Sequence, residues 1–381
     1  MDKQQEPRLR FQDFTGEWKT EGFESVGEFN PKAEIPQIFQ YVDLESVVGT
    51  QLISYREEFK ETAPSRAQRL AKNGDLFFQA VRPYQKNNYL FEKNNENFVF
   101  STGYIQIRPQ NDGYFLLTLV QKEEFIQEVL LRCTGTSYPA INTSSLQNIA
   151  ILIPPTAEEQ THLGLFFRRL DSQIAESRAV LEKSRQLKKA MLAKMFPANG
   201  EKIPKIRFKG FEGEWECRKL GEIGELYQPR TITGTDLTFT GYPVFGANGY
   251  IGFYGEANHF EDQVTISARG EGTGTANYVI APVWITGNSM VINVDCNNEI
   301  DKKFLFALLT VMSLKKYVTG GAQPQLTREV LEKISLKIPT LPEQTAIGNF
   351  FRQLDETIAL QAAEVEKLNQ LKKGLLAAML V

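Results

Sequence analysis

The sequence predicts an α/β (α+β) protein in which two globular β-rich domains are joined by two long helices that form an antiparallel coiled-coil spacer. Three observations predict this fold class. One helical stretch occurs twice, a shorter segment ahead of each globular stretch also occurs twice, and the globular stretches contain short apolar runs bounded by Gly, Pro and Asn. The chain is therefore expected to have an internal pseudo-two-fold repeat.

The duplicated helical stretch reads EQTHLGLFFRRLDSQIA from Glu159 and EQTAIGNFFRQLDETIA from Glu343, at an offset of 343 − 159 = 184. Eleven of its 17 positions are identical, where average residue frequencies give roughly one. The shorter segments, called lead-ins here, read PRLRFQDFTGEW from residue 7 and PKIRFKGFEGEW from residue 204. Since lead-ins and helices match while the stretches between them differ, we expect two diverged domains on one repeated frame.

The order of these segments divides the chain into four parts. We expect domains at residues 1–155 and 201–339, and long helices at 156–200 and 340–381. Within the first domain, the expected strands are 74–84, 97–109 and 149–155, and the expected helix is 115–131. Within the second, strands joined by glycine turns are expected over 243–255, 262–280 and 289–295, a further strand over 334–339, and the matching helix over 302–318.

Both long helices carry a start signal and an apolar stripe. Thr156 precedes Glu159 by three residues, and Thr340 precedes Glu343 by three, which is the spacing of a capping box. Spacings of three and four, typical of a heptad seam, separate Leu163, Phe167, Leu170, Ile174, Leu181, Met191 and Met195 in the first helix, and Ile347, Phe351, Leu354, Ile358, Val365, Leu368, Leu375 and Met379 in the second. Each helix would span roughly 60 Å at 1.5 Å per residue.

Such a narrow stripe is best buried if the two helices pack against each other. Polar residues at Ser177, Ser184, Lys188, Gln361 and Lys372 are expected to weaken this packing locally and leave the register open. The alternative is two unrelated surface helices on separate domains.

Composition bounds the setting of the protein. No stretch approaches 18 apolar residues, which predicts no membrane span. Three scattered cysteines favour a reducing compartment, so the cytoplasm is expected. The net charge of −3 gives nucleic-acid binding no general support. The first long helix is locally basic, which is typical of a solvated face and is also compatible with a phosphate backbone alongside.

The chain offers no recognisable catalytic, cofactor or metal site. Its two histidines, His162 and His259, are too far from any cysteine pair for a zinc site. GEGTG at 270–274 is followed by a strand pattern, so no helix start is available to bind a pyrophosphate. A nucleotide-dependent enzyme using this loop is therefore the weakest hypothesis, and a protein without catalysis of its own is predicted.

Taken together, the capped EQ-FF-R-LD-IA helices, the lead-ins and the loops RPYQKN, GTSYPAIN and GGAQPQLT resemble the DNA-specificity subunit of type I restriction-modification systems. The resemblance covers nearly the whole chain. It implies that the domains are target-recognition domains that read the two halves of an interrupted, asymmetric site in double-stranded DNA, and that the helices are the spacer. It also implies two docked copies of an adenine-N6 methyltransferase subunit and a restriction-translocase subunit.

Base readout is expected from polar residues in loops that differ between the halves. Arg can bond guanine bidentately, and Asn or Gln can bond adenine. The candidates are Arg82, Tyr84, Lys86, Asn87, Ser137 and Tyr138 in the first half, and Asn248, Arg269, Gln323 and Gln325 in the second. Each could instead be an ordinary surface residue. An alternative function is a coiled-coil scaffold or adaptor without sequence-specific DNA binding.

Overall fold

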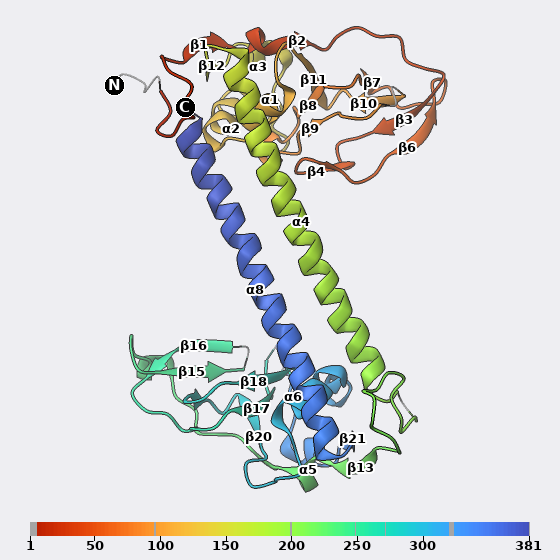
Figure 1. The fold of residues 1–381 in the computed structure, drawn as a ribbon, viewed down its shortest axis with the longest axis vertical. Coiled ribbons are helices and arrows are strands. Elements are labelled where there is room, and N and C mark those ends of the chain that lie inside the picture. The colour runs from red at the N-terminus through yellow and green to blue at the C-terminus, as the bar shows by residue number, and fades with distance from the viewer. Residues whose placement is uncertain are drawn as a thin grey trace. The chain divides into compact units, whose positions relative to one another are not determined.

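The computed structural model describes residues 6–94, 97–198, 200–247, 249–270, 272–319 and 324–380. Contacts divide the chain into two compact units (Figure 1). Unit 1 comprises Met1–Arg178 with Glu364–Val381, and unit 2 comprises Ala179–Ala363. Each unit therefore contains part of both long helices, α4 (Ala157–Met195) and α8 (Leu341–Met379). Across the described ranges, no helix is both long and apolar enough to cross a bilayer.

The described strands of unit 1 form two larger sheets and two short pairs. The sheet β2-β11-β8-β9 consists of Gly27–Phe29, Tyr104–Pro109, Leu76–Gln79 and Tyr89–Leu90. The sheet β6-β3-β10-β7 consists of Arg56–Phe59, Ile38–Val42, Phe98–Ser101 and Ala67–Leu70. The pairs are β1 (Lys19–Gly22) with β12 (Ala150–Ile153), and β4 (Val47–Val48) with β5 (Gln51–Leu52). Strands β8 and β10, rich in Phe, are buried along their whole length, which places the core between the sheets and helices.

The helices of unit 1 depart from the sequence prediction at one point. They are α1 (Gly113–Val120), α2 (Glu123–Leu130), α3 (Thr143–Gln147), and the 3₁₀ turns η1 (Phe23–Val26) and η2 (Pro83–Gln85). The single helix expected over 115–131 is wrong, because Lys122 is extended and separates α1 from α2. Its buried ammonium donates to the carbonyl of Leu380 at 3.0 Å, a contact that local periodicity cannot indicate.

Unit 2 repeats this plan, with three described strands in its second sheet where unit 1 has four. The sheet β14-β20-β17-β18 consists of Glu225–Tyr227, Ser289–Asn293, Gln263–Ser267 and Ala276–Val279, and the sheet β16-β15-β19 of Gly249–Tyr254, Tyr242–Gly246 and Trp284–Ile285. β13 (Glu216–Lys219) pairs with β21 (Ser335–Ile338). The helices are α5 (Leu220–Ile223), α6 (Lys302–Val311), α7 (Arg328–Glu332), η3 (Gly234–Asp236) and η4 (Leu314–Tyr317). The helix expected over 302–318 is therefore two elements, α6 and η4.

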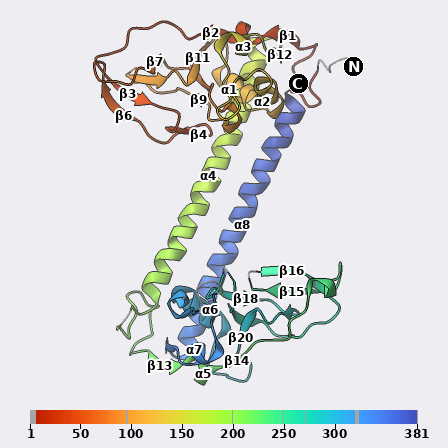
Figure 2. The same ribbon diagram turned by 180° about the vertical axis from the view of Figure 1, so that it is seen from behind.

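The internal repeat is confirmed by equivalent pairings in the two units. In each, the strand that follows the lead-in pairs antiparallel with the strand that precedes the long helix, with Lys19 opposite Ile153 and Glu216 opposite Ile338. Figures 1 and 2 show α6 beside α8 in unit 2 from opposite sides. The frame around each domain is thus built twice from the same sequence pattern.

The long helices begin where the sequence predicts, but the side chains of Glu159 and Glu343 bind arginines and do not cap the helices. The hydroxyl of Thr156 accepts from the amide of Glu159 at 3.2 Å, which is half of the expected capping box. The buried carboxylate of Glu159 binds the guanidinium of Arg10 in the lead-in at 2.7 and 2.8 Å. Glu343 binds Arg207 in the same way, at 2.7 and 2.6 Å. The reciprocal capping role is therefore wrong, because each glutamate anchors a lead-in instead.

The apolar stripes pack antiparallel within each unit. In unit 1, Leu163, Phe167, Leu170 and Ile174 of α4 share one buried cluster with Met379 near the end of α8. In unit 2, the last residues of α4 share a core with the first turns of α8. The seam is not purely helix against helix, since Trp18 and Phe115 of the domain also join the unit 1 cluster. Leu181, Ile347 and Phe351 are buried, whereas Leu354, Ile358 and Val365 are half-buried.

The two lysines at seam positions form ion pairs across the helix pair. Lys372 of α8 binds Asp171 of α4 at 2.5 Å in unit 1. Lys188 of α4 binds Asp355 of α8 in unit 2. The two pairs are related by the offset of 184 residues, since 355 − 171 = 372 − 188 = 184. A shift by one residue would separate both pairs, so they help to fix the register.

A glycine in each long helix allows close packing on a neighbouring helix start. Asp112 caps α1 by accepting from the amide of Phe115 at 2.7 Å, and Asp301 caps α6 by accepting from Phe304 at 2.8 Å. A β-carbon at Gly348 would lie 2.7 Å from both the carboxylate of Asp301 and the amide nitrogen of Phe304. Gly164 faces Asp112 in the same manner.

We expect Gly348→Ala to destabilise unit 2 by about 1–3 kcal/mol, because the amide it would strike cannot move without distorting α6. The change would be measured as the midpoint of urea unfolding. Gly374→Ala is the matched control on the same helix, since a β-carbon there meets nothing within 4 Å. That control should gain about 1 kcal/mol from helix propensity. Equal effects of the two alanines would contradict the packing argument.

Candidate nucleic-acid interface

In both units, two loops far apart in sequence meet at the end of a central strand. In unit 1, Val81 after β8 forms a β-bridge with Ala140, which also bridges Thr134. In unit 2, Arg269 after β17 bridges Gln325, which also bridges Thr319. The fold therefore brings together the loops at which the sequence analysis placed candidate residues. We call them loop cluster 1 (residues 81–88 and 134–140) and loop cluster 2 (residues 269–274 and 319–325, of which 271 and 320–323 are outside the described ranges).

Loop cluster 1 presents an arginine and two tyrosines. The amide of Arg82 donates to the carbonyl of Pro139 at 2.7 Å, and its guanidinium carbon lies 4.2 Å from the ring centre of Tyr138. Tyr84 and Tyr138 are 50% and 65% exposed, and Ser137 is exposed. Arg82 has a left-handed backbone with φ of 54°, a conformation uncommon for a side chain of this size. Planar groups and hydroxyls are thus presented to solvent from a constrained turn.

Two other candidates in this cluster are engaged within unit 1. The ammonium of Lys86 binds the carboxylate of Glu123 at 2.8 Å and the carbonyl of Gln121 at 3.2 Å. This hydrogen bond from Lys86 lowers the pKa of Glu123. The side chain of Asn87 accepts from the amide of Gly49 at 2.8 Å and so holds the β4–β5 hairpin. Lys86 and Asn87 therefore position the loop, whereas Tyr84, Ser137 and Tyr138 are exposed and Arg82 is half-buried against Tyr138.

Loop cluster 2 presents different side chains from the same frame. Arg269 and Gln325 are both exposed and are held opposite each other by their bridge. The candidates Asn248 and Gln323 lie outside the described residues. Equivalent hydrogen bonds, from Ile141 to Ala80 and from Leu326 to Ala268, each at 3.0 Å, align Val81 with Arg269. Arg82 therefore corresponds to Gly270, and Arg269 corresponds to Val81.

The glycine-rich stretch that ends at Gly274 packs against η4. It leads into β18, as predicted. Gly274, at φ of 88°, lies close to η4, where a β-carbon would be 3.3 Å from the amide nitrogen of Lys315. Lys315 and Lys316 are both exposed beside loop cluster 2. Sequence reasoning missed these cations because it placed them in a continuous helix.

His259 has a structural environment. It is buried, its Nε2 lies 2.8 Å from the hydroxyl of Tyr227 and its Nδ1 lies 2.6 Å from the side-chain oxygen of Asn258. Burial lowers the pKa of His259, which favours the neutral ring. Among the residues described, no group of three or more His, Cys, Asp or Glu side chains is arranged to hold a metal ion.

Comparison with known proteins identifies this frame. The family model for the type I restriction modification DNA specificity domain matches residues 71–183 and 212–370, more than half of the chain. A putative type I restriction enzyme MjaX specificity subunit from Methanocaldococcus jannaschii is 23% identical over 88% of this chain and 84% of its own. The MjaVIII specificity subunit from the same organism is 22% identical over 74% and 73%.

A solved structure shares the fold. The crystal structure of a type I restriction-modification system S subunit from M. genitalium superposes with a TM-score of 0.73 at 17% identity, covering 99% of both chains. At that identity the likeness bears on architecture alone, and the family assignment depends on the sequence match. With two matched regions, one in each half of the repeat, the chain belongs to the family of type I restriction-modification DNA specificity subunits.

Proposed function

We propose that this chain is the non-catalytic subunit that reads DNA sequence for a type I restriction-modification complex, with one half of an interrupted site read by each loop cluster. The observation that carries the proposal is that equivalent bridges, Val81 with Ala140 and Arg269 with Gln325, join the two loops of each cluster. Arg82 and Tyr138 lie beside the bridge in unit 1, whereas Arg269 and Gln325 form it in unit 2. Equivalent frames with unlike side chains suit unlike half-sites, because base edges are distinguished by hydrogen-bond pattern. The target would therefore be asymmetric.

The proposed partners are those that the family resemblance implies, and the repeated frame suits them. Lead-ins and helix starts match between the units, which suits two copies of one methyltransferase subunit that transfers methyl groups to adenine N6. A restriction-translocase subunit would complete the complex, and the setting would be the cytoplasm. Chemistry on DNA would come from these partners. A scaffold without sequence-specific DNA binding is the competing reading.

The direct test maps methylated adenines across the genome of cells that express the methyltransferase subunit with or without this chain. We expect a bipartite motif to become methylated only when the chain is present. Arg269→Ala should relax one half of that motif and leave the other half unchanged. Methylation that does not depend on the chain, or that lacks any sequence motif, would favour the scaffold reading.

Lengthening both helices should change the gap between the half-sites. We expect four residues inserted between Arg178 and Lys188, together with four between Asp355 and Asn369, to add about 6 Å to each helix. That is one or two base pairs of B-DNA, at about 34 Å per helical turn. Both seam ion pairs stay outside the insertions. Mapping the methylated adenines gives the number of base pairs between the two half-sites. An insertion in α4 alone is the control, because it puts the apolar stripes of the two helices out of register. An unchanged gap in the doubly lengthened protein would contradict the spacer role.

A further inference from the structure

Equivalent arginine and aspartate side chains on the two long helices face a space that is filled by a side chain in unit 1 and is a cavity in unit 2. Arg168 and Asp171 of α4 correspond to Arg352 and Asp355 of α8 at the offset of 184. In each unit these side chains lie next to the helix whose start is capped by Asp112 or Asp301. The residue two positions after that cap is Tyr114 in unit 1 and Lys303 in unit 2. This exchange decides what occupies the space beside the long helix.

In unit 1, Tyr114 fills this space. Its hydroxyl donates to Oδ2 of Asp171 at 2.9 Å, and the guanidinium carbon of Arg168 lies 4.7 Å from its ring centre. The other oxygen of Asp171 accepts from Lys372 at 2.5 Å. Glu92 binds the far side of Arg168 and holds it in place. The phenol ring of Tyr114 is thus surrounded by Arg168, by α1 and by Asp171, whose carboxylate oxygens bind the Tyr114 hydroxyl and Lys372.

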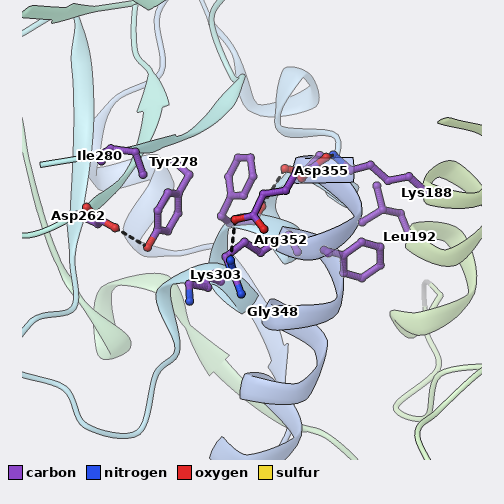
Figure 3. A pocket seen from close by; sticks show the side chains of 14 residues that line it. Lys188, Leu192, Asp262, Tyr278, Ile280, Lys303, Gly348, Arg352 and Asp355 are labelled. Carbon is purple, nitrogen blue, oxygen red and sulfur yellow. Dashed lines mark hydrogen bonds and ion pairs between the residues drawn. The ribbon is translucent and has the colours of Figure 1, made fainter. Parts of the chain in front are cut away.

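In unit 2, the corresponding space is a cavity of about 430 Å³. Lys303 turns away from Asp355, with its ammonium 3.4 Å from the side-chain oxygen of Asn349. Ile280 occupies the position that Glu92 has in unit 1. Ile280 lies two residues after Tyr278, the strand partner of Val264. Glu92 lies two residues after the strand partner of Leu76, which is the unit 1 equivalent of Val264. Figure 3 shows Arg352 and Asp355 on one wall of this cavity, with Tyr278 and Ile280 opposite.

The cavity retains the groups that receive the tyrosine in unit 1. Oδ1 of Asp355 accepts from Lys188, as Oδ1 of Asp171 accepts from Lys372. Oδ2 of Asp355, the counterpart of the atom that binds Tyr114, has no hydrogen-bond partner among the described residues. Phe306 and Phe351 line the apolar side. The volume suits a single aromatic ring with water, being at the low end of ligand pockets.

We propose that this cavity is a binding site for a 4-hydroxyphenyl group, supplied as a tyrosine side chain by a protein partner of unit 2. The hydroxyl donates to Oδ2 of Asp355, and the ring lies against Phe306 under Arg352. Unit 1 shows the arrangement with a side chain of this chain in that place, and Glu356 binds Arg352 in an ion pair as Glu92 binds Arg168. The ammonium of Lys303, which lines the cavity, can pair with an acidic group flanking a partner's tyrosine. The partner identity rests on the proposed function, which gives the chain protein partners. Because unit 1 is filled by its own tyrosine, this contact is made once per chain.

The experiment tests the full chain with two matched probes, p-cresol and toluene. Binding of each probe is measured by ligand-observed NMR and by calorimetry. We expect p-cresol to bind saturably, one per chain, and about tenfold more tightly than toluene, the ratio for one hydrogen bond to a charged acceptor. Lys303→Tyr should abolish binding by supplying the missing ring. Asp355→Ala should make the two probes bind equally. Unaltered p-cresol binding by Lys303→Tyr, or no saturable binding to the wild type, would overturn the site.

A reverse variant and an assembled complex complete the test. Tyr114→Lys with Glu92→Ile should open the corresponding space in unit 1 and raise the stoichiometry to two p-cresol molecules per chain. In the complex with methyltransferase and restriction subunits, a partner tyrosine should exclude p-cresol from unit 2. Undiminished p-cresol binding there would overturn the partner assignment. Sequence-specific DNA binding by the Lys303→Tyr chain should be unchanged, so this inference and the proposed function can fail separately.

Discussion

Replacing Arg207 with alanine is expected to lower the free energy of unfolding of unit 2 by about 3–5 kcal/mol, the cost of leaving a buried charge without its partner. Glu343 is 1% exposed and receives two hydrogen bonds from Arg207, at 2.7 and 2.6 Å. The same guanidinium donates to the carbonyls of Gly213 and Glu212, at 2.7 and 3.0 Å, and so closes the lead-in. Hydrogen exchange of peptides from the lead-in and the start of α8 measures the loss of protection.

The equivalent change in unit 1 should cost less. Glu159 also accepts from the indole nitrogen of Trp18 at 3.3 Å, so it keeps one donor when Arg10 is replaced by alanine. The indole nitrogen of Trp215 is buried without a partner and gives Glu343 no such help. Lys205→Ala removes an exposed cation from the same lead-in and should change stability by no more than about 0.5 kcal/mol. If Arg207→Gln/Glu343→Gln were as unstable as Arg207→Ala, buried charge would not be the cause.

Replacing Arg82 with alanine is expected to reduce discrimination at one base pair of one half-site by about 10- to 100-fold, corresponding to about 1–3 kcal/mol for one bidentate base contact. The guanidinium is held over Tyr138 by a turn in the left-handed region, so it reaches its target with little loss of freedom on binding. Binding of the complex to a library of sites that vary at every position would show which position is relaxed.

Loss of a positive charge must be separated from loss of base reading. Arg132→Ala removes a cation of the same type that is paired with Glu128 at the end of α2, near loop cluster 1. It should leave discrimination unchanged and at most weaken all sites alike, as loss of a phosphate contact does. If Arg82→Ala also weakened every site equally, Arg82 would be a phosphate contact and not a reader of bases.

Much of the fold is visible in the sequence because its signals are local or repeated. Periodicity predicts the two long helices, and each begins within a residue of the expected position. The glycine-bounded runs over 243–255 and 262–280 form β15 to β18, and the matching lead-ins indicate the repeat. These signals depend on neighbours within a few positions, or on comparison of one half with the other. The loops chosen as candidates also meet in space, although sequence alone gives no reason for the bridges that join them.

The role of individual polar residues was decided by contacts between distant segments. Glu159 has the spacing of a cap, yet its carboxylate binds an arginine 149 positions earlier. Lys86 and Asn87 look like surface residues of a reading loop, but α2 and the β4–β5 hairpin occupy their side chains. Lys122 interrupts a good helical pattern because its ammonium reaches the end of α8. Hydrogen bonds of this kind outweigh local preference and leave no trace in spacing.

By itself the sequence determined the duplicated frame and the two long helices, since repetition and periodicity are visible without knowledge of any contact; the class of protein was indicated by the resemblance of its motifs to a known family. The tertiary structure alone decided the register of the helices, through Asp171 with Lys372 and Asp355 with Lys188. It also decided that Tyr114 fills a space that Lys303 leaves open. The physical reason is that an ion pair or a filled cavity depends on which side chains the folded chain brings within a few ångströms, and that proximity is set by packing over more than a hundred residues.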